Sequence, residues 1–221
     1  MRADALTIPF WSDDEIERAV RPALAQLENR LVLAYPTETV YGFGGAIDRE
    51  SVEKLVAMKR RPPGKPFLLL VDGPAMIDRL DLHMPAYAAR LIAVHWPGPL
   101  TLVLRGGEGR VLPRLRGPEG GVAVRWTSHE GIRRVIRAHG DALTSTSANL
   151  PGIPPAQTAR EIVDQWPDAI NRGVLRVLDG GRLVPSEPST VIDCTGRHPR
   201  IIRPGAVGAT VLRESVPALI G

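Results

Sequence analysis

Hydrophobic and polar residues follow two different spacings along this chain of 221 residues. Unbroken apolar runs of about five residues predict buried strands. The clearest runs lie at 31–35, 67–71, 101–104, 122–126, 142–146, 174–178, 190–194 and 201–203. Apolar residues three or four positions apart, flanked by capping residues or proline, predict helices. These segments lie at about 12–29, 48–59, 74–80, 85–95 and 130–139, with one more after Thr158 and a last one in the tail.

The order of these elements predicts the fold class. Strands and helices alternate in the first half and strands cluster in the last third, which favours an α/β fold with an open sheet of mixed direction. The 22 Gly and 21 Pro residues indicate short elements and shaped turns, and they disfavour helix bundles and coiled coils. The glycine-rich segment 105–121 is predicted to be exposed and irregular. No linker-like change in composition occurs, so the sequence predicts a single domain over 1–221.

Cysteine usage and hydropathy limit the class further. The only cysteine, Cys194, rules out an intramolecular disulfide or a multi-cysteine zinc site, and its apolar neighbours predict a buried strand residue. The N-terminus lacks the apolar run of a signal peptide, and no segment approaches the roughly 20 apolar residues of a membrane span. We therefore expect a cytoplasmic protein.

The basic residues are unevenly divided between arginine and lysine. Lys and Arg together number 28 against 24 Asp and Glu, a formal net charge of +4, but only three of the 28 are lysines. Two of them, Lys59 and Lys65, lie within seven residues, which suggests a compact ammonium for phosphate binding; chance clustering is the alternative. Lys59 and Arg61 are predicted to be solvent-accessible, where a helix meets Pro62 and Pro63.

Signatures of the common enzyme classes are missing. The chain has no G-x-x-x-x-G-K-[ST] phosphate loop, and its glycines do not follow the G-x-G-x-x-G spacing of a dinucleotide fold. It also lacks H-E-x-x-H and G-x-S-x-G, and its five histidines are scattered. The sequence therefore predicts no metal ligands and no serine nucleophile.

Polar side chains gather instead where predicted strands begin or end, which is the usual place for ligand sites in open α/β sheets. They supply cations, hydroxyls and one carboxamide, which suit the binding of anions and a small polar molecule better than catalysis by paired acids. The candidates are Thr37, Lys59, Arg61, Lys65, Thr101, Arg125, Ser145, Ser147, Asn149, Ser189 and Arg203. Turn caps, surface ion pairs and loop hydrogen bonds are the alternative roles of these residues.

Several motifs, taken in their order, resemble the YrdC family. They are PTETVYGFGG at 36–45, K-x-R at 59–61, KP at 65–66, WPGPLTLVL at 96–104, VAVRW at 122–126, TSTSANLPG at 144–152, PSTVID at 188–193 and IIRPG at 201–205. The resemblance spans about 15–207, and the chain is similar to the short, single-domain form of the family.

The resemblance implies both a fold and a reaction. It implies a twisted open α/β sheet of the YrdC type with a concave basic face. It also implies that ATP, L-threonine and bicarbonate give threonylcarbamoyl-adenylate and pyrophosphate, for threonylcarbamoyladenosine modification of tRNA next to the anticodon. A separate transferase complex completes that modification in the family. Mg²⁺ is expected to arrive with ATP, held mainly by phosphates and water.

The resemblance also implies roles for the candidate residues. It assigns the reaction to Lys59, Arg61, Ser147 and Asn149. It assigns ATP binding to these four together with Lys65, Thr101, Ser145 and Arg203. Threonine binding falls to Thr37, Arg125 and Ser189, with Arg125 as a two-point fork for the threonine carboxylate.

Two positions near the expected amino acid depart from the family pattern. Leu70 stands where longer forms often have a histidine, and Trp126 with Thr127 follows Arg125 where a proline is common.

Two other functions stay open at this stage. One is a non-catalytic module that binds tRNA or double-stranded RNA through a basic concave face. The other is a family paralogue with a changed carbamoylation substrate. Aromatic residues make up only 5% of the chain, so stacking on single-stranded RNA is poorly supported.

Overall fold

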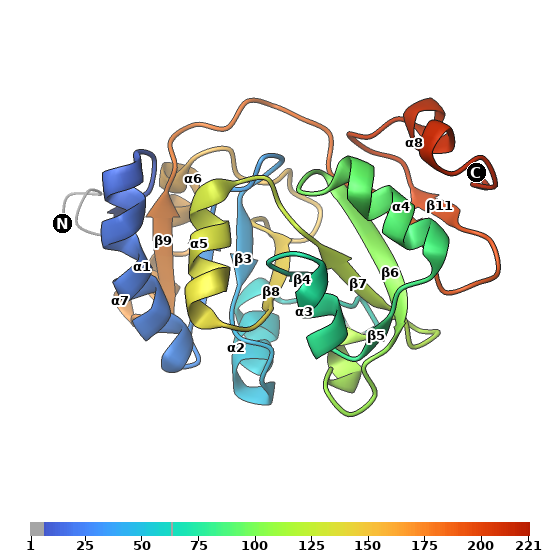
Figure 1. Cartoon of the computed structure of the whole chain (residues 1–221). Helices are drawn as coiled ribbons and strands as arrows, with labels where there is room; N and C mark the ends of the chain where they lie inside the picture. The colour runs from blue at the N-terminus through green and yellow to red at the C-terminus, as the bar shows by residue number, and fades with distance from the viewer. Residues whose placement is uncertain (1–6, 63) are drawn as a thin grey trace.

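The computed structural model describes residues 7–62 and 64–221, so Pro63 and the first six residues, on which part of the signal-peptide expectation rested, lie outside it. The described chain forms one open sheet with helices around it (Figure 1). The strands are β1 (Thr7–Pro9), β2 (Val32–Tyr35), β3 (Gly42–Gly44), β4 (Leu68–Leu70), β5 (Leu82–His83), β6 (Leu100–Gly106), β7 (Val122–Arg125), β8 (Leu143–Ser147), β9 (Leu175–Asp179), β10 (Thr190–Asp193) and β11 (Arg200–Arg203).

The sheet is of mixed direction, which confirms the predicted fold class. Its strand order is β1-β9-β2-β3-β8-β4-β7-β6-β10-β11, and β5 pairs with β6 outside this path. The pairs β1–β9, β2–β9, β4–β7 and β6–β10 are parallel, and the other pairs are antiparallel. Because β1 and β11 end the path without pairing to each other, the sheet stays open.

The helices begin and end largely where the sequence predicts. They are α1 (Asp13–Glu28), α2 (Arg49–Lys59), α3 (Pro74–Arg79), α4 (Ala86–His95), α5 (Glu130–His139), α6 (Ala159–Gln165), α7 (Pro167–Asn171) and α8 (Ala209–Ser215), with a 3₁₀ turn at Pro113–Leu115. The predicted capping box is present at α1, where the Glu15 amide donates to Ser12 Oγ and the Ser12 amide donates to Glu15 Oε2. The helix continues through Pro22.

The end of α2 directs the chain toward the centre of the sheet. Asp48 caps its first turn by accepting from the amides of Glu50 and Ser51. At the other end, Arg60 adopts a left-handed conformation with φ of 50°, which stops the helix directly after Lys59. The two residues of the K-x-R motif therefore stand on either side of a helix end.

Some elements differ from the sequence prediction. The loop that follows β2 contains the short strand β3, and the short strands β1 and β5 also lie outside the predicted runs. The segment 105–121 is not wholly exposed, because β6 extends to Gly106 and both Val111 and Leu115 are buried. These apolar residues were too sparse among glycines and prolines to predict burial.

The apolar core fits the predicted patterning. The buried side chains of β2, β4 and β8 pack with apolar faces of the helices in one cluster. Cys194 is buried directly after β10, as predicted, and burial raises the pKa of its thiol to about 12. Among the described residues, no helix combines the length and the apolar composition that a membrane crossing needs.

A long connection crosses the molecule between β9 and β10. Figure 1 shows it arching above the sheet, from a strand near one edge to a strand near the other. Ser186 in this connection donates a hydrogen bond to the Thr39 carbonyl at 3.2 Å. The connection is thereby tied to the loop that follows β2.

Candidate active site

A pocket of about 380 Å³ lies over the middle of the sheet. Its walls come from strands that follow one another across the sheet, namely β3, β8, β4, β7, β6, β10 and β11. Leu68 on β4 pairs in register with Ala123 on β7 and with Ser145 on β8, so these three lining residues share one face. The rest of the lining comes from the loops that follow β2 and β8 and from the segments that precede β4 and β10.

The pocket lining is rich in hydroxyls and guanidinium groups. Of the residues predicted from the sequence, it contains Thr37, Thr101, Ser145, Ser147, Ser189, Arg61, Arg125 and Arg203. None of the lining residues within the described chain is Asp or Glu. Lys59, Lys65 and Asn149 do not line the pocket.

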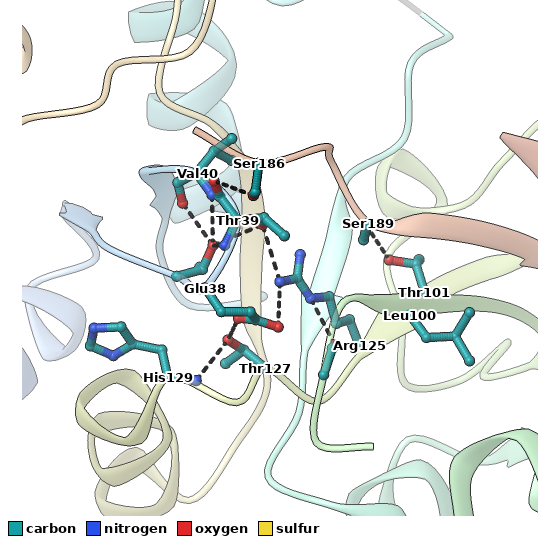
Figure 2. Close-up of polar contacts among 12 residues, drawn as sticks. Glu38, Thr39, Val40, Leu100, Thr101, Arg125, Thr127, His129, Ser186 and Ser189 are labelled. Atoms are coloured by element: carbon teal, nitrogen blue, oxygen red, sulfur yellow. Dashed lines mark hydrogen bonds and ion pairs between the residues drawn. The ribbon is translucent and has the colours of Figure 1, made fainter. Parts of the chain in front are cut away.

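Arg125 is held from one side by three protein acceptors. Its Nη2 lies 2.7 Å from Glu38 Oε1 and donates to Thr39 Oγ1 at 3.2 Å, and its Nε donates to the Gly98 carbonyl at 3.3 Å. Figure 2 shows the Glu38 carboxylate between Arg125 and Thr127. Arg125 is only 4% exposed, so this ion pair is shielded from water.

Glu38 carries the counter-charge of Arg125. Burial raises the pKa of Glu38. The charge of Arg125 and the hydrogen bond donated by Thr127 Oγ1 lower this pKa by more than burial raises it, so the net shift is downward. The carboxylate therefore stays ionised beside the guanidinium. Thr127 is fully buried and also accepts from the His129 amide at 3.2 Å.

The loop after β2 is shaped by Thr37. Its hydroxyl donates to the Val40 carbonyl at 2.7 Å and accepts from the amides of Thr39 and Val40, each at 3.2 Å. This is the turn-capping role that the sequence left open as the alternative. Thr37 nevertheless lines the pocket, so the residue that shapes the turn also forms part of the wall.

A second polar group joins β6, β10 and β11. Thr101 Oγ1 and Ser189 Oγ are 2.8 Å apart, and Arg203 Nη2 donates to Ser189 Oγ at 3.0 Å and to the Ser189 carbonyl at 2.7 Å. Burial lowers the pKa of Arg203, and the nearby positive charge of Arg125 lowers it further. Arg203 has no carboxylate partner among the described residues.

Arg61 enters the pocket from the segment before β4. Its Nη1 donates to Thr146 Oγ1 at 2.8 Å, its Nη2 donates to the Pro66 carbonyl at 2.6 Å, and its guanidinium lies 4.4 Å from the Phe67 ring centroid. Burial, and then the charge of Arg114, lower its pKa. Arg61 is half-buried, which fits the predicted accessibility better than Lys59 does.

The prediction that Lys59 is solvent-accessible is wrong. The residue is 5% exposed, and its Nζ donates to the Asn149 carbonyl at 3.0 Å, to Asn149 Oδ1 at 2.8 Å and to the Ser147 carbonyl. The last residue of α2 lies against the loop that follows β8, a long-range contact that helix periodicity cannot show. Burial, and then the charge of Arg61, lower the pKa of Lys59 to about 7.

Ser147 and Asn149 belong to the same cluster as Lys59. Ser147 Oγ donates to Asn149 Oδ1 at 2.6 Å, and its distance from Lys59 Nζ is 3.5 Å. The Asn149 amide group donates to the Ile153 carbonyl at 2.5 Å. Lys65, by contrast, is exposed, and its carbonyl accepts from Arg61 Nε at 3.1 Å. Its ammonium is thus separate from this cluster.

The protein supplies no cluster of side chains suited to a metal ion within the described residues. The pocket lining likewise offers hydroxyls and guanidinium groups rather than carboxylates.

The structure adds polar residues that the sequence analysis did not select. Glu38 and Thr39 lie in the same motif as Thr37, and Thr146 lies between Ser145 and Ser147, yet only their partners across the sheet show their contacts with Arg125 and Arg61. The available signal for the Glu38–Arg125 pair was an acidic residue directly between two threonines of the motif, together with Arg125 as a predicted anion-binding residue.

The structure also shows the two departures from the family pattern. Leu70 is fully buried and pairs in register with Arg125. The Arg133 guanidinium lies 4.9 Å from the Trp126 ring centroid, and Thr127 is fully buried and donates to Glu38.

The fold and the pocket together define an open-sheet α/β protein with a pocket lined by arginines and hydroxyls. The family model named Sua5/YciO/YrdC, described as telomere recombination, matches residues 25–205. The chain therefore belongs to the Sua5/YciO/YrdC family, which confirms the resemblance seen in the motifs.

Relatives and a solved structure agree with this assignment. The chain is 33% identical to the threonylcarbamoyl-AMP synthase of Pyrococcus abyssi over 86% of its own length and 55% of that protein. It is also 33% identical to the threonylcarbamoyl-AMP synthase of Chromohalobacter salexigens, over 79% of its length and 91% of that protein. The crystal structure of P. abyssi Sua5 complexed with L-threonine superimposes with a TM-score of 0.88 at 29% identity, covering 97% of this chain and 62% of that one. The chain thus spans little more than half of the P. abyssi synthase.

Proposed function

We propose that this protein is an L-threonylcarbamoyladenylate synthase, a nucleotidyltransferase that forms threonylcarbamoyl-AMP and pyrophosphate from ATP, L-threonine and bicarbonate. The observation that carries the proposal is the charge of the pocket, which is lined by Arg61, Arg125 and Arg203 and by no carboxylate among the described residues. Such a lining favours anionic ligands. The named relatives and the threonine complex of P. abyssi Sua5 support the choice of ligands.

The ATP triphosphate is assigned to the part of the site where cations lack a carboxylate partner. Arg61 lines the pocket, and Lys59 Nζ lies 3.5 Å from the hydroxyl of Ser147, which also lines it. Together with Arg203, they leave positive charge uncompensated by the described side chains, which a polyphosphate can neutralise. Ser145, Thr101, Ser147 and Asn149 supply further hydroxyl and amide groups for the nucleotide, and Lys65 supplies an exposed charge nearby in sequence.

L-Threonine is assigned to the side of Arg125, with Thr37 and Ser189 as the other predicted contacts. Arg125 is already paired with Glu38, so this side carries less net charge than the Arg61 side. A zwitterionic amino acid suits such a place better than a triphosphate does. Thr101 and Ser189, 2.8 Å apart, lie between the two ligands in this assignment.

The chemistry follows from positioning two anions that repel each other. The threonine amine and bicarbonate form a carbamate with loss of water. A carbamate oxygen then attacks the α-phosphorus of ATP, while the bond between the α-phosphorus and the pyrophosphate oxygen breaks and pyrophosphate leaves. No protein nucleophile is needed, so the protein acts by aligning the reactants and by stabilising the charge on departing pyrophosphate. Mg²⁺, brought with ATP, would neutralise part of the phosphate charge when bound. Arg61 and the loop held by Lys59 orient the phosphates in this scheme.

The product is proposed to serve threonylcarbamoyladenosine modification of tRNA. A separate transferase complex would then consume this mixed anhydride. The need for ATP and tRNA places the reaction in the cytoplasm. We further propose that the domain 1–221 performs the synthase step alone.

The proposal is tested by pyrophosphate release from the purified protein. Release is expected only when ATP, L-threonine and bicarbonate are all present. Equal release with serine, or without an amino acid, would exclude threonine as the substrate and favour a paralogue with another substrate. Direct RNA contact is tested in the same preparation, because binding that merely follows the basic pocket is weakened by ATP and steeply by salt. Tight binding to a defined RNA that is insensitive to ATP would instead favour the RNA-binding module.

A further inference from the structure

The guanidinium of Arg125 has few donors left for a ligand. An arginine carries five N–H groups, one on Nε and two on each terminal nitrogen. The Gly98 carbonyl accepts from Nε and Thr39 Oγ1 accepts from Nη2, while Glu38 Oε1 forms an ion pair with Nη2 at 2.7 Å. Among the described residues, Nη1 donates no hydrogen bond. A ligand carboxylate can therefore accept a hydrogen bond from Nη1. The two-point fork expected from the sequence would also use Nη2, which already contacts Glu38 and Thr39.

The position of Nη1 depends on how firmly Glu38 is held. Figure 2 shows Arg125 and Thr127 approaching the Glu38 carboxylate from different sides. Arg125 meets Oε1, and the Thr127 hydroxyl donates to Oε2. Thr127 is itself fixed, because it is fully buried and accepts from the His129 amide. Neither Glu38 nor Thr127 lines the pocket.

We propose that Glu38 and Thr127 are positioning residues for the amino-acid carboxylate, acting through Arg125 and without touching the ligand. The chain of contacts from the His129 amide to Thr127, Glu38 and Arg125 holds the guanidinium of this pocket-lining residue in one orientation and leaves Nη1 without a protein hydrogen bond among the described residues. This inference rests on the proposed function, in which Arg125 contacts threonine. Thr127 is the better residue to test, because it belongs to the segment where the family commonly has a proline. A proline has no hydroxyl that could donate to Glu38.

The experiment compares L-threonine with L-threoninol, which keeps the amine and the side chain but replaces the carboxylate with a hydroxymethyl group. Dissociation constants are measured by calorimetry, with threoninol followed by competition against threonine. In the wild type, threonine is expected to bind more tightly because of Arg125. Thr127→Val removes the hydroxyl while keeping the shape, and it should reduce the preference for threonine over threoninol about 10-fold, the scale of losing one hydrogen bond to a charged group.

Two variants separate positioning from general damage. Thr127→Ser keeps the hydroxyl and should retain the wild-type preference. Thr144→Val is a matched control, because Thr144 is also fully buried and its hydroxyl binds the Gly45 backbone rather than the Arg125 group. This substitution should weaken the binding of threonine and threoninol equally, or leave the binding of both unchanged. If Thr127→Val does not fold, Thr127→Ala makes the same comparison with a smaller side chain.

The outcomes for the two proposals are distinct. An unchanged preference in Thr127→Val, or an equal loss for both ligands, would overturn the positioning role while pyrophosphate release by the wild type still supports the synthase. A wild-type protein that neither binds threonine nor releases pyrophosphate with it would overturn the proposed function and this inference together.

Discussion

The two most buried cations of the site, Arg125 and Lys59, have different neighbours. Both are about equally hidden, at 4% and 5% exposed. Arg125 faces the carboxylate of Glu38, whereas Lys59 Nζ is surrounded by the neutral oxygens of Ser147 and Asn149. The neighbouring charge that acts on the Lys59 pKa is that of Arg61, which is also positive.

Because of this difference, the two sides of the site suit ligands of different charge. A buried cation with a counter-ion keeps its charge and its orientation, but it adds little net attraction. A buried cation without one is costly until an anion arrives, and burial accordingly lowers the pKa of Lys59 to about 7. The Lys59 side is therefore suited to a polyanion and the Arg125 side to a ligand with balanced charges.

The largest expected effect follows from removing the uncompensated lysine. Lys59→Ala should lower turnover by about 10²-fold or more, because the phosphates lose a cation and the loop at Ser147 and Asn149 loses its anchor. Lys59→Arg should also impair turnover, since a planar fork cannot replace an ammonium among three oxygens. Pyrophosphate release measures both variants. Lys54→Ala is the control, because Lys54 lies on the same helix and pairs with Glu50.

Burial of Lys59 also changes the expected stability of that variant. A solvent-accessible lysine could be removed at little cost, but here three oxygens lose their donor. A lower melting temperature should therefore accompany the loss of turnover. Near-normal turnover in a destabilised Lys59→Ala protein would reduce Lys59 to a loop anchor and remove it from the phosphate side.

The second effect tests the compensated cation. Glu38→Ala leaves the Arg125 charge buried without its partner, which should lower the free energy of unfolding by about 3 kcal/mol. Urea denaturation measures this change. Glu50→Ala is the control, because Glu50 pairs with Arg30 and Lys54 at an exposed surface and should change stability by less than about 1 kcal/mol. Equal effects of the two substitutions would mean that the Arg125 pair is no more shielded than a surface pair.

The fold was largely predictable because its signals are local. Apolar runs gave the main strands, and the Ser12–Glu15 capping box gave the start of α1. The short strands β1, β3 and β5 have two or three residues each, too few for a period of two to stand out. Strand order was not predicted and comes from the structure, since pairing partners such as β2 and β9 are far apart in the sequence.

The site was predictable as a set of residues but not as a set of contacts. Strand-end clustering and family motifs pointed to Arg61, Arg125 and Arg203, which the fold brings into one pocket. Neither signal could show that Arg125 is paired with Glu38 or that Lys59 is covered by the loop after β8. Both contacts join segments more than 80 residues apart, and only packing across the sheet brings them together.

The third effect is a pH dependence that distinguishes the two cations. Because the pKa of Lys59 is lowered to about 7 in the folded protein, the lysine should lose its proton above neutral pH before ATP binds. The value of kcat/KM for ATP, which reports the free enzyme, should therefore fall by up to about tenfold per pH unit above pH 7. The value of kcat should fall less, because bound phosphates favour the charged lysine.

Stability should change in the opposite direction with pH. The folded pKa of Lys59 lies below the ordinary value of 10.5, so the unfolded chain binds more protons between about pH 7 and pH 10.5. The contribution of this group to stability consequently rises with pH across that window and is lost as pH falls through 7. Urea titrations of the wild type against Lys59→Met isolate this contribution. If the difference in the free energy of unfolding between the two proteins does not change with pH, the lysine is not desolvated.

The smallest effect concerns Lys65, the third lysine and a predicted ATP ligand. Its side chain is exposed, so solvent screens its charge, and only its carbonyl contacts Arg61. Lys65→Ala should raise the KM for ATP by about threefold at low salt, leave kcat unchanged, and lose even this effect near 0.5 M salt, where the screening length is roughly 4 Å. Lys54→Ala, whose charge is paired with Glu50, should change neither constant. A loss of about 10²-fold in Lys65→Ala that persists at high salt would mean that Lys65 closes onto the phosphates when ATP binds. The uncompensated positive side of the site would then extend beyond the buried Lys59 to the segment before β4.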